Sequence, residues 1–361
     1  MTADISLLAE RFRYEMENLP YVCAAREGIG GRIKAEPEHF RVEEILPYGA
    51  CGQGEHVYVT VRRKGYNSPD VARRLARAAG IGASKVGFGG RKDKNALTTQ
   101  TFSLAVGQKT AAATVEKKLA GLPFEILAVD RHTNKIKTGH VAANRFRILL
   151  SGVESASLPE AREIAAILVV KGVPNFYGPQ RFGRNGANIE RALKLALGGP
   201  AGRRPDRFMV SVFQSLLFNS CLTLRHRQGD LFSMLEGDVA RKTDTGGIFV
   251  VQDAAEANQR FRQHKIVYTG PIYGHKMLAA RRAAGRLEAK ILEAAGIAAQ
   301  DFKRLRARGS RRPAIIFPET IDIRPDPGGL LFEFTLPSGA YATVVMREFT
   351  RPKNLTAADH I

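Results

Sequence analysis

Strand-like segments lie near both ends of the chain and helical segments lie between them, and this order restricts the folds that the chain can adopt. Short strands are expected at residues 33–34, 40–42, 56–61, 99–104, 124–127 and 144–150, and again at 330–336 and 341–349. Helical apolar spacing is found at 159–170, 188–197, 208–227 and 282–295. Because two strands alone are marginal in water, the late pair is expected to return to the early sheet as a hairpin.

Composition changes near Asn175 and Arg311, which indicates a segment inserted into a sheet-containing domain. The predicted division is therefore residues 1–174 and 311–361 for the two parts of that domain and residues 175–310 for the insertion. In the first part, Ser68 is the expected N-cap of a helix that ends at Gly80.

The chain is strongly basic. Its 361 residues include 55 Lys and Arg against 35 Asp and Glu, a formal charge of +20. A phosphate backbone is the commonest partner of such a surface, although a ribosome-adherent or merely soluble basic protein has the same composition. Hydrophobic residues make up 44% of the chain, which favours a folded core over a disordered basic tail.

Cysteine usage and hydropathy indicate the compartment. The three cysteines are far apart and odd in number, so buried reduced thiols are expected rather than disulfides. No apolar run approaches the roughly 20 residues that span a bilayer, and residues 1–5 lack the order of a secretion signal. We expect a cytoplasmic protein with no membrane association, and a monomer is the simplest expectation.

Asp93 stands in the glycine-rich run Gly89-Gly90-Arg91-Lys92-Asp93-Lys94-Asn95, among three cations and just before a predicted strand. Opposite charges within about 4–6 Å lower the pKa of a carboxyl group by roughly 1–3 units, so Asp93 is expected to be ionised and suited to attack or proton abstraction. The alternative is a turn-forming aspartate that caps its own backbone.

The sequence lacks the motifs of several common enzyme classes. There is no Cys-x-x-Cys and no His-Glu-x-x-His, so a zinc deaminase or zinc hydrolase is excluded by its ligands. The glycines at 87–90 match neither a phosphate-binding loop nor a dinucleotide fingerprint. Chemistry on a nucleic acid without metal or cofactor remains.

A series of motifs in fixed order resembles the TruD family of tRNA pseudouridine synthases. The similarity covers nearly the whole chain, and its motifs lie at residues 31–40, 52–56, 90–98, 131–137, 144–146, 175–183, 214–219 and 336–343. The departures are His39, where the family usually has aspartate, and Asn95, where histidine is common.

This resemblance implies an α+β fold, with a pseudouridine-synthase-type catalytic domain around a mixed, largely antiparallel sheet and an inserted helix-rich α/β domain. It implies isomerisation of a tRNA uridine, expected to be uridine-13, to pseudouridine without metal or cofactor. The cleft between the two domains is the expected tRNA site.

The resemblance also assigns the residues, by matching positions. Asp93 falls on the catalytic aspartate and Lys34 on its basic partner, while Asn144 and Phe146 fall at the base. Phe146 could stack beneath an everted uracil, although a core residue of its strand is the plain alternative. Candidate RNA contacts are Arg91, Lys92, Arg181, Arg184 and the basic residues between Lys303 and Arg312.

Two other functions remain open on the sequence. A non-catalytic RNA-binding or assembly protein would use the same basic surface. An RNA glycosidase or nuclease would release free base or cut the strand, and would change the mass of its product.

Overall fold

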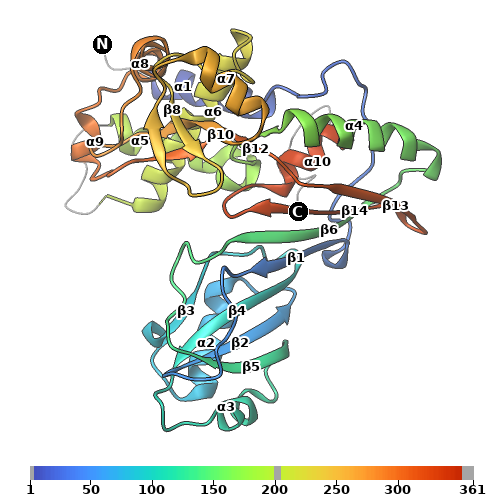
Figure 1. Cartoon of the computed structure of the whole chain (residues 1–361). Helices are drawn as coiled ribbons and strands as arrows, with labels where there is room; N and C mark the ends of the chain where they lie inside the picture. The colour runs from blue at the N-terminus through green and yellow to red at the C-terminus, as the bar shows by residue number, and fades with distance from the viewer. Residues whose placement is uncertain (1–3, 199–204, 352–361) are drawn as a thin grey trace. The chain divides into compact units, whose positions relative to one another are not determined.

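The computed structural model describes residues 4–198 and 205–351, which form two compact units (Figure 1). Of these residues, 29–162 and 319–339 belong to unit 2, and the others belong to unit 1. The predicted domain boundaries at 174 and 310 stay a prediction.

Unit 2 is built on one eight-stranded sheet with the order β13-β14-β6-β1-β4-β2-β5, in which β3 pairs with β4. Only β1 and β4 pair in parallel among these strands. The expected mixed, largely antiparallel sheet is therefore confirmed. Its strands are β1 (Phe40–Ile45), β2 (His56–Arg63), β3 (Val86–Phe88), β4 (Leu97–Ala105), β5 (Glu125–His132), β6 (Ala143–Ser151), β13 (Ile321–Asp326) and β14 (Gly329–Pro337).

Two helices, α2 (Ser68–Ala79) and α3 (Ala112–Leu119), pack their apolar sides into the core of this unit. Val59 of β2, Leu75 of α2 and Phe102 of β4 are completely buried there. The core extends along the whole length of β2, because alternate residues of that strand face it.

The start of α2 corrects one expectation. The N-cap is Asn67, whose side chain accepts a hydrogen bond from the backbone N–H of Asp70, and Ser68 is the first helical residue. Since Asn67 caps the helix, the buried hydroxyl of Ser68 is available for other partners. The predicted end is confirmed, because Gly80 follows α2 in the left-handed conformation.

Unit 1 is mostly helical and carries two small sheets, β11-β10-β8-β9 and β12-β7. Its strands are β7 (Val173–Pro174), β8 (Val239–Lys242), β9 (Ile248–Val250), β10 (Ile266–Ile272), β11 (Ser310–Pro313) and β12 (Ile315–Ile316). Its helices are α1 (Ile5–Glu17), most of α4 (Leu158–Lys171), α5 (Ala187–Leu197), α6 (Arg207–Arg227), α7 (Ala254–Arg262), α8 (Arg282–Ala294), α9 (Asp301–Arg304) and α10 (Ala342–Thr350). The four predicted helices in this part of the chain are confirmed as α4, α5, α6 and α8.

Short 3₁₀ turns connect many of these elements, at η1 (Pro37–His39), η2 (Ala83–Lys85), η3 (Ser155–Ser157), η4 (Pro179–Arg181) and η5 (Arg184–Gly186). Among the helices of the described ranges, α6 is long and apolar enough to cross a membrane by length and composition alone. However, 72% of its apolar stretch is buried, as in the central helix of a folded unit.

Two expected strands are wrong. Residues 341–349 were expected as the second strand of a hairpin, but residues 342–350 form the helix α10, and β14 pairs instead with β13 and β6. Tertiary contacts outweigh the strand preference of Thr343, Val344 and Val345, because every residue from 342 to 349 is buried. Residues 33–34 do not form a strand either, since Lys34 has a left-handed backbone with φ of 58°.

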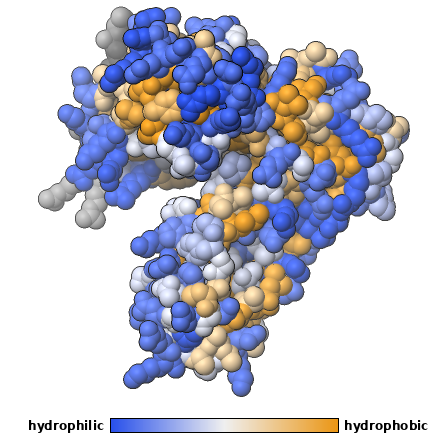
Figure 2. All heavy atoms as spheres, in the orientation of Figure 1, coloured by the Kyte–Doolittle hydropathy of each residue, from blue (hydrophilic) through white to orange (hydrophobic). Residues whose placement is uncertain are grey.

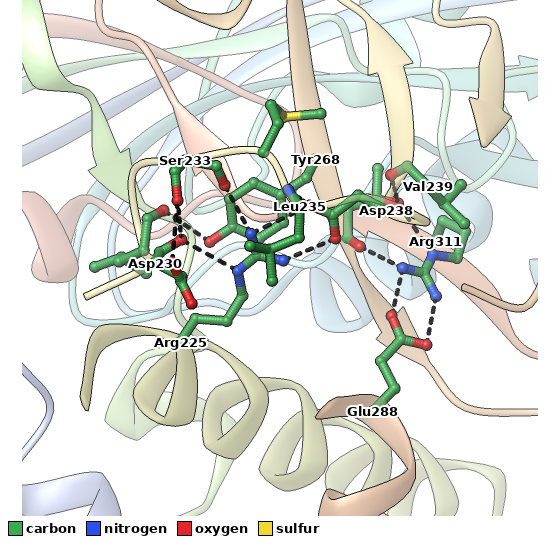
Figure 3. A network of polar contacts seen from close by, with 12 residues as sticks. Arg225, Asp230, Ser233, Leu235, Asp238, Val239, Tyr268, Glu288 and Arg311 are labelled. Atoms are coloured by element: carbon green, nitrogen blue, oxygen red, sulfur yellow. Dashed lines mark hydrogen bonds and ion pairs between the residues drawn. The ribbon is translucent and has the colours of Figure 1, made fainter. Parts of the chain in front are cut away.

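Charged side chains are also buried inside unit 1 (Figure 3). Arg225 donates to both carboxylate oxygens of Asp238, at 2.7 and 3.1 Å, and Arg311 donates to both oxygens of Glu288, at 3.0 and 2.7 Å. Arg311 therefore serves the interior of unit 1, although it belongs to the basic segment that the sequence analysis considered for RNA contacts.

The surface matches the composition. Hydrophilic side chains cover most of the visible face of both units, with smaller apolar patches among them (Figure 2).

Cys23 and Cys221 are buried free thiols as expected, whereas Cys51 is exposed because it lies in the open loop between β1 and β2.

Candidate active site

Asp93 and Lys34 form an ion pair in unit 2. Lys34 Nζ donates to Asp93 Oδ2 at 2.8 Å, although 59 residues separate them in the sequence. The Lys34 side chain is 2% exposed, whereas 37% of the Asp93 side chain is exposed. The lysine is thus a buried support, and the carboxylate remains within reach of a ligand.

The second oxygen of Asp93 organises its own loop. Asp93 Oδ1 accepts a hydrogen bond from the backbone N–H of Asn95 at 3.0 Å, which is the local turn considered in the sequence analysis. The two interpretations of this aspartate are therefore compatible, because each uses a different oxygen.

The electrostatics of this pair keep Asp93 charged. Partial burial opposes ionisation, but the Lys34 charge, its hydrogen bond and the backbone N–H groups of Lys94 and Asn95 outweigh it, so that the pKa of the Asp93 carboxyl lies below its usual value. A carboxylate in this state can act as a nucleophile or a base and cannot act as a proton donor near neutral pH.

Phe40 connects this ion pair to Phe146. Lys34 Nζ lies 4.6 Å from the centroid of the Phe40 ring, a cation–π contact. The ring of Phe40 also lies edge-on to the ring of Phe146, with a centroid separation of 6.1 Å. The sequence analysis gave Phe40 no role, although it ends the first motif of the series and begins β1.

Phe146 lies in β6 between two aromatic neighbours. Its ring is 5.6 Å from that of Phe334 on β14, and the residue is 6% exposed. Strand pairing explains the contact, because Phe146 is directly opposite Phe334 in the antiparallel register. Phe146 therefore packs between the rings of Phe40 and Phe334, and Phe40 is the ring that contacts Lys34.

Lys92, which immediately precedes Asp93, contacts Asn144 and Glu44 through its side chain. Lys92 Nζ donates to Asn144 Oδ1 and lies 3.0 Å from Glu44 Oε2. Sequence reasoning missed Glu44, although its signal was present: the period-two pattern of β1 places Phe40, Val42 and Glu44 on the same buried face.

The remaining candidates are distributed over both units. Arg91 is exposed in the loop that carries Asp93. Arg181 and Arg184 lie in unit 1, at η4 and η5. Arg181 donates through Nε to Ser215 Oγ at 3.1 Å, and its guanidinium carbon is 5.3 Å from the centroid of the Phe208 ring.

Metal ligands are not gathered around these residues. Within residues 4–198 and 205–351, no three His, Cys, Asp or Glu side chains are close enough to hold a metal ion. The polar groups described at this site are the carboxylates of Asp93 and Glu44, the ammonium groups of Lys34 and Lys92, and the amide of Asn144.

Comparison with known proteins places the chain in a family. The family model described as tRNA pseudouridine synthase D (TruD) matches residues 16–193 and 203–349. Relatives named tRNA pseudouridine synthase D include one from Anaeromyxobacter dehalogenans, 43% identical over 93% of this chain and 97% of its own. Another, from Thermus thermophilus, is 37% identical over 96% of each chain.

A solved structure shows the same fold. The crystal structure of a Methanosarcina mazei protein assigned to TruD has a TM-score of 0.71 with this chain, at 22% identity, over 94% of this chain and 97% of that one. The family model covers most of the sequence and relatives exceed 30% identity over nearly all of it, so this chain belongs to the tRNA pseudouridine synthase D (TruD) family.

Proposed function

We propose that this protein converts a uridine of tRNA, expected to be uridine-13, to pseudouridine, with Asp93 as the catalytic carboxylate. Family membership makes it an isomerase of the tRNA pseudouridine synthase type. The observation that carries the residue assignment is the ion pair in which buried Lys34 holds an ionised, accessible Asp93.

Asp93 would act on the nucleotide as an anion. Three routes use such a group: attack at C1′ of the ribose, removal of the 2′ proton to give a glycal-like intermediate, and attack at C6 of the base. Each route needs a charged oxygen with one face open, and Asp93 Oδ2 has Lys34 on one side while the side chain is 37% exposed. The 2.8 Å contact with Lys34 stabilises the charge before the reaction and orients it.

The target base has to leave the RNA stack first. Everting a nucleotide costs a few kcal/mol, and stacking on an aromatic side chain contributes about 1–3 kcal/mol per base. We assign this stacking role to Phe146. Because Phe146 is 6% exposed in the free protein, stacking requires a neighbouring side chain to move when RNA binds.

The tRNA backbone would be bound by two exposed arginines, Arg91 and Arg184, and by the half-buried Arg181. Arg91 is exposed beside Asp93, and Arg184 is exposed in unit 1. In the described part of the chain, Arg181 makes its side-chain hydrogen bond through Nε to Ser215. We therefore assign its two terminal nitrogens to the recognition of a phosphate group. The proposal includes a monomeric cytoplasmic enzyme that needs neither metal nor cofactor and has no membrane association.

One incubation tests this function. Uridine-labelled tRNA is treated with the protein without additives, and pseudouridine is mapped by carbodiimide modification and primer extension. We expect one modified position with the wild-type protein and none with Asp93→Asn, which keeps the shape of the side chain and removes its charge. Normal modification by Asp93→Asn would disprove the catalytic assignment.

The same experiment separates the alternatives. A binding or assembly protein would leave the uridine unchanged, whereas a glycosidase or nuclease would release base or shorten the strand. Isomerisation leaves the mass of the RNA unchanged, so a product of altered mass would reject the isomerase.

A further inference from the structure

We propose that Lys92 is a positioning residue, which fixes the Asp93 loop to a buried polar cluster rather than contacting RNA. The polar cluster consists of the side chains of Glu44, Arg63, Ser68 and Gln100. This inference rests on the proposed function, because it assigns Lys92 a role in aligning Asp93 for that reaction.

Lys92 is held at both its main chain and its side chain. Its backbone N–H donates to Ser68 Oγ at 2.9 Å. Its Nζ lies 3.0 Å from Glu44 Oε2 and donates to Asn144 Oδ1. Asp93 is the next residue, so its backbone position is determined on the amino-terminal side by these contacts.

Gln100 fixes a second point of the same loop. Its Nε2 donates to Gly90 O at 2.8 Å and to Glu44 Oε2 at 3.0 Å. Its Oε1 accepts from Ser68 Oγ at 2.8 Å and from Arg63 Nη2 at 3.0 Å. Gly90 and Lys92 are thus anchored on either side of Arg91, immediately before the proposed catalytic residue.

The polar cluster and the Lys92 side chain are largely buried, and the ammonium group is already bonded to Glu44 and Asn144. The side chain of Glu44 is 0% exposed and that of Lys92 is 10% exposed. Arg63 is 2% exposed, Gln100 is 1% and Ser68 is 0%. The two printed partners of the ammonium group, Glu44 and Asn144, are both buried residues of unit 2, which favours an internal role over a phosphate contact.

The energetics also favour a role beyond stability. A buried ion pair often stabilises a protein no more than apolar residues of similar volume would. Here Glu44 Oε1 and Arg63 Nη1 are buried without a hydrogen-bond partner among the described residues, which adds a desolvation cost. What the polar cluster supplies is a defined position for residues 90–92, and a misplacement of about 1 Å can lower a rate by about 100-fold.

The test separates position from stability with a double mutant. Glu44→Gln leaves both Lys92 and Arg63 as buried cations without a carboxylate, and Lys92→Met leaves Glu44 with Arg63 alone, whereas the double variant Glu44→Gln/Lys92→Met removes both partners of the ion pair and keeps the wild-type net charge of the buried groups. The melting temperature, kcat and KM for tRNA are measured for all three, with pseudouridine formation as the readout. We expect the double variant to melt at a higher temperature than Glu44→Gln, while its kcat stays about 10- to 100-fold below wild type at a KM within about twofold.

The matched control is the buried pair of unit 1, Arg225 and Asp238, whose side chains are 3% and 2% exposed. The double variant Arg225→Met/Asp238→Asn removes a comparable pair whose hydrogen bonds are made within unit 1. We expect its kcat to stay within about twofold of wild type once the folded fraction is taken into account. A comparable loss of kcat in this control would show a general effect of removing a buried pair and would overturn the inference.

Ser68→Ala provides a variant that buries no unpaired charge. It removes the acceptor of the Lys92 backbone N–H, and we expect a lower kcat with unchanged KM. Wild-type kcat in both Ser68→Ala and the Glu44/Lys92 double variant would overturn the positioning role, as would a raised KM with unchanged kcat. These outcomes differ from failure of the proposed function, in which the wild-type protein itself forms no pseudouridine.

Discussion

The ammonium group of Lys34 lies over the ring of Phe40, 4.6 Å from its centroid. The same ammonium group donates to Asp93, so the aromatic face supports the residue that keeps the carboxylate charged. Lys34 has an uncommon backbone conformation as well, with φ of 58°. Such conformations cost about 1–3 kcal/mol and persist where surrounding contacts hold them.

Replacing Phe40 tests this support. A cation–π contact contributes about 0.5–2 kcal/mol, so Phe40→Leu is expected to lower kcat by about tenfold as Lys34 loses its orientation. Phe12→Leu in unit 1 is the matched control, because Arg11 lies 4.9 Å from the ring of the fully buried Phe12. Both variants should lose stability in urea. An equal loss of kcat in the two would contradict the specific role of Phe40.

Replacing Lys34 changes the pH dependence. The folded-state pKa of Asp93 is lowered, so the stability that its ionisation contributes is present above the unfolded value and is lost as pH falls through the folded value. In Lys34→Met the burial of Asp93 remains without the opposing charge, and the acidic limb of kcat/KM should move to higher pH. Lys34→Arg keeps the positive charge, so the acidic limb of kcat/KM should move less in this variant. The measurement is kcat/KM from about pH 4 to 8, and identical acidic limbs in wild type and Lys34→Met would contradict this account.

Phe146 can be separated from the core that surrounds it. Phe146→Leu and Phe334→Leu make the same change in two touching rings on neighbouring strands, and each should cost about 1–3 kcal/mol of stability. Only Phe146→Leu should also lower kcat by about 10- to 100-fold, because base stacking is worth about 1–3 kcal/mol. The affinity for tRNA should change little, since phosphate contacts supply most of it. Equal kcat losses in the two variants would identify Phe146 as a core residue alone.

Arg181 is expected to act through charge. Arg181→Ala should weaken tRNA binding and reduce the steepness of its salt dependence by about one unit of the logarithmic slope. Arg227→Ala serves as a control. Arg227 is exposed at the end of α6, roughly 28 Å along the helix from Phe208, the residue whose ring Arg181 contacts. Binding isotherms at several salt concentrations would reveal the slope. An unchanged slope in Arg181→Ala would exclude a phosphate contact.

Much of the sheet could be predicted because its strands alternate clearly. The residues of β1 and β6, and the first six residues of β4, show period-two burial, and the sheet orders these strands as a mixed, largely antiparallel layer. The segment that became α10 could not be assigned from its own residues, because β-branched Thr343, Val344 and Val345 favour a strand when considered alone. Its helical state depends on distant partners, such as Arg347, which donates to the carbonyl oxygens of Leu19 and Pro20.

Some residues of the candidate site could be predicted from the sequence, and others could not. Asp93 stands out in the sequence because an acid among cations is unusual, and the structure brings it to Lys34. The inward direction of Lys92 was not predictable from its own motif, because a lysine beside two other cations is usually solvated. Glu44 determines that direction, and its burial follows from the register of β1 rather than from any motif.

The parallel pairing of β1 with β4 has a consequence for the assembly of this site. Arg41 is opposite Leu97, so the segments that precede both strands, with Lys34 in one and Asp93 in the other, emerge at the same edge of the sheet. A slip of one residue would displace Lys34 by about 3.3 Å and turn Glu44 to the opposite face. The register of β1 and β4 therefore determines the distance between Lys34 and Asp93. This distance is established when the protein folds, before RNA binds.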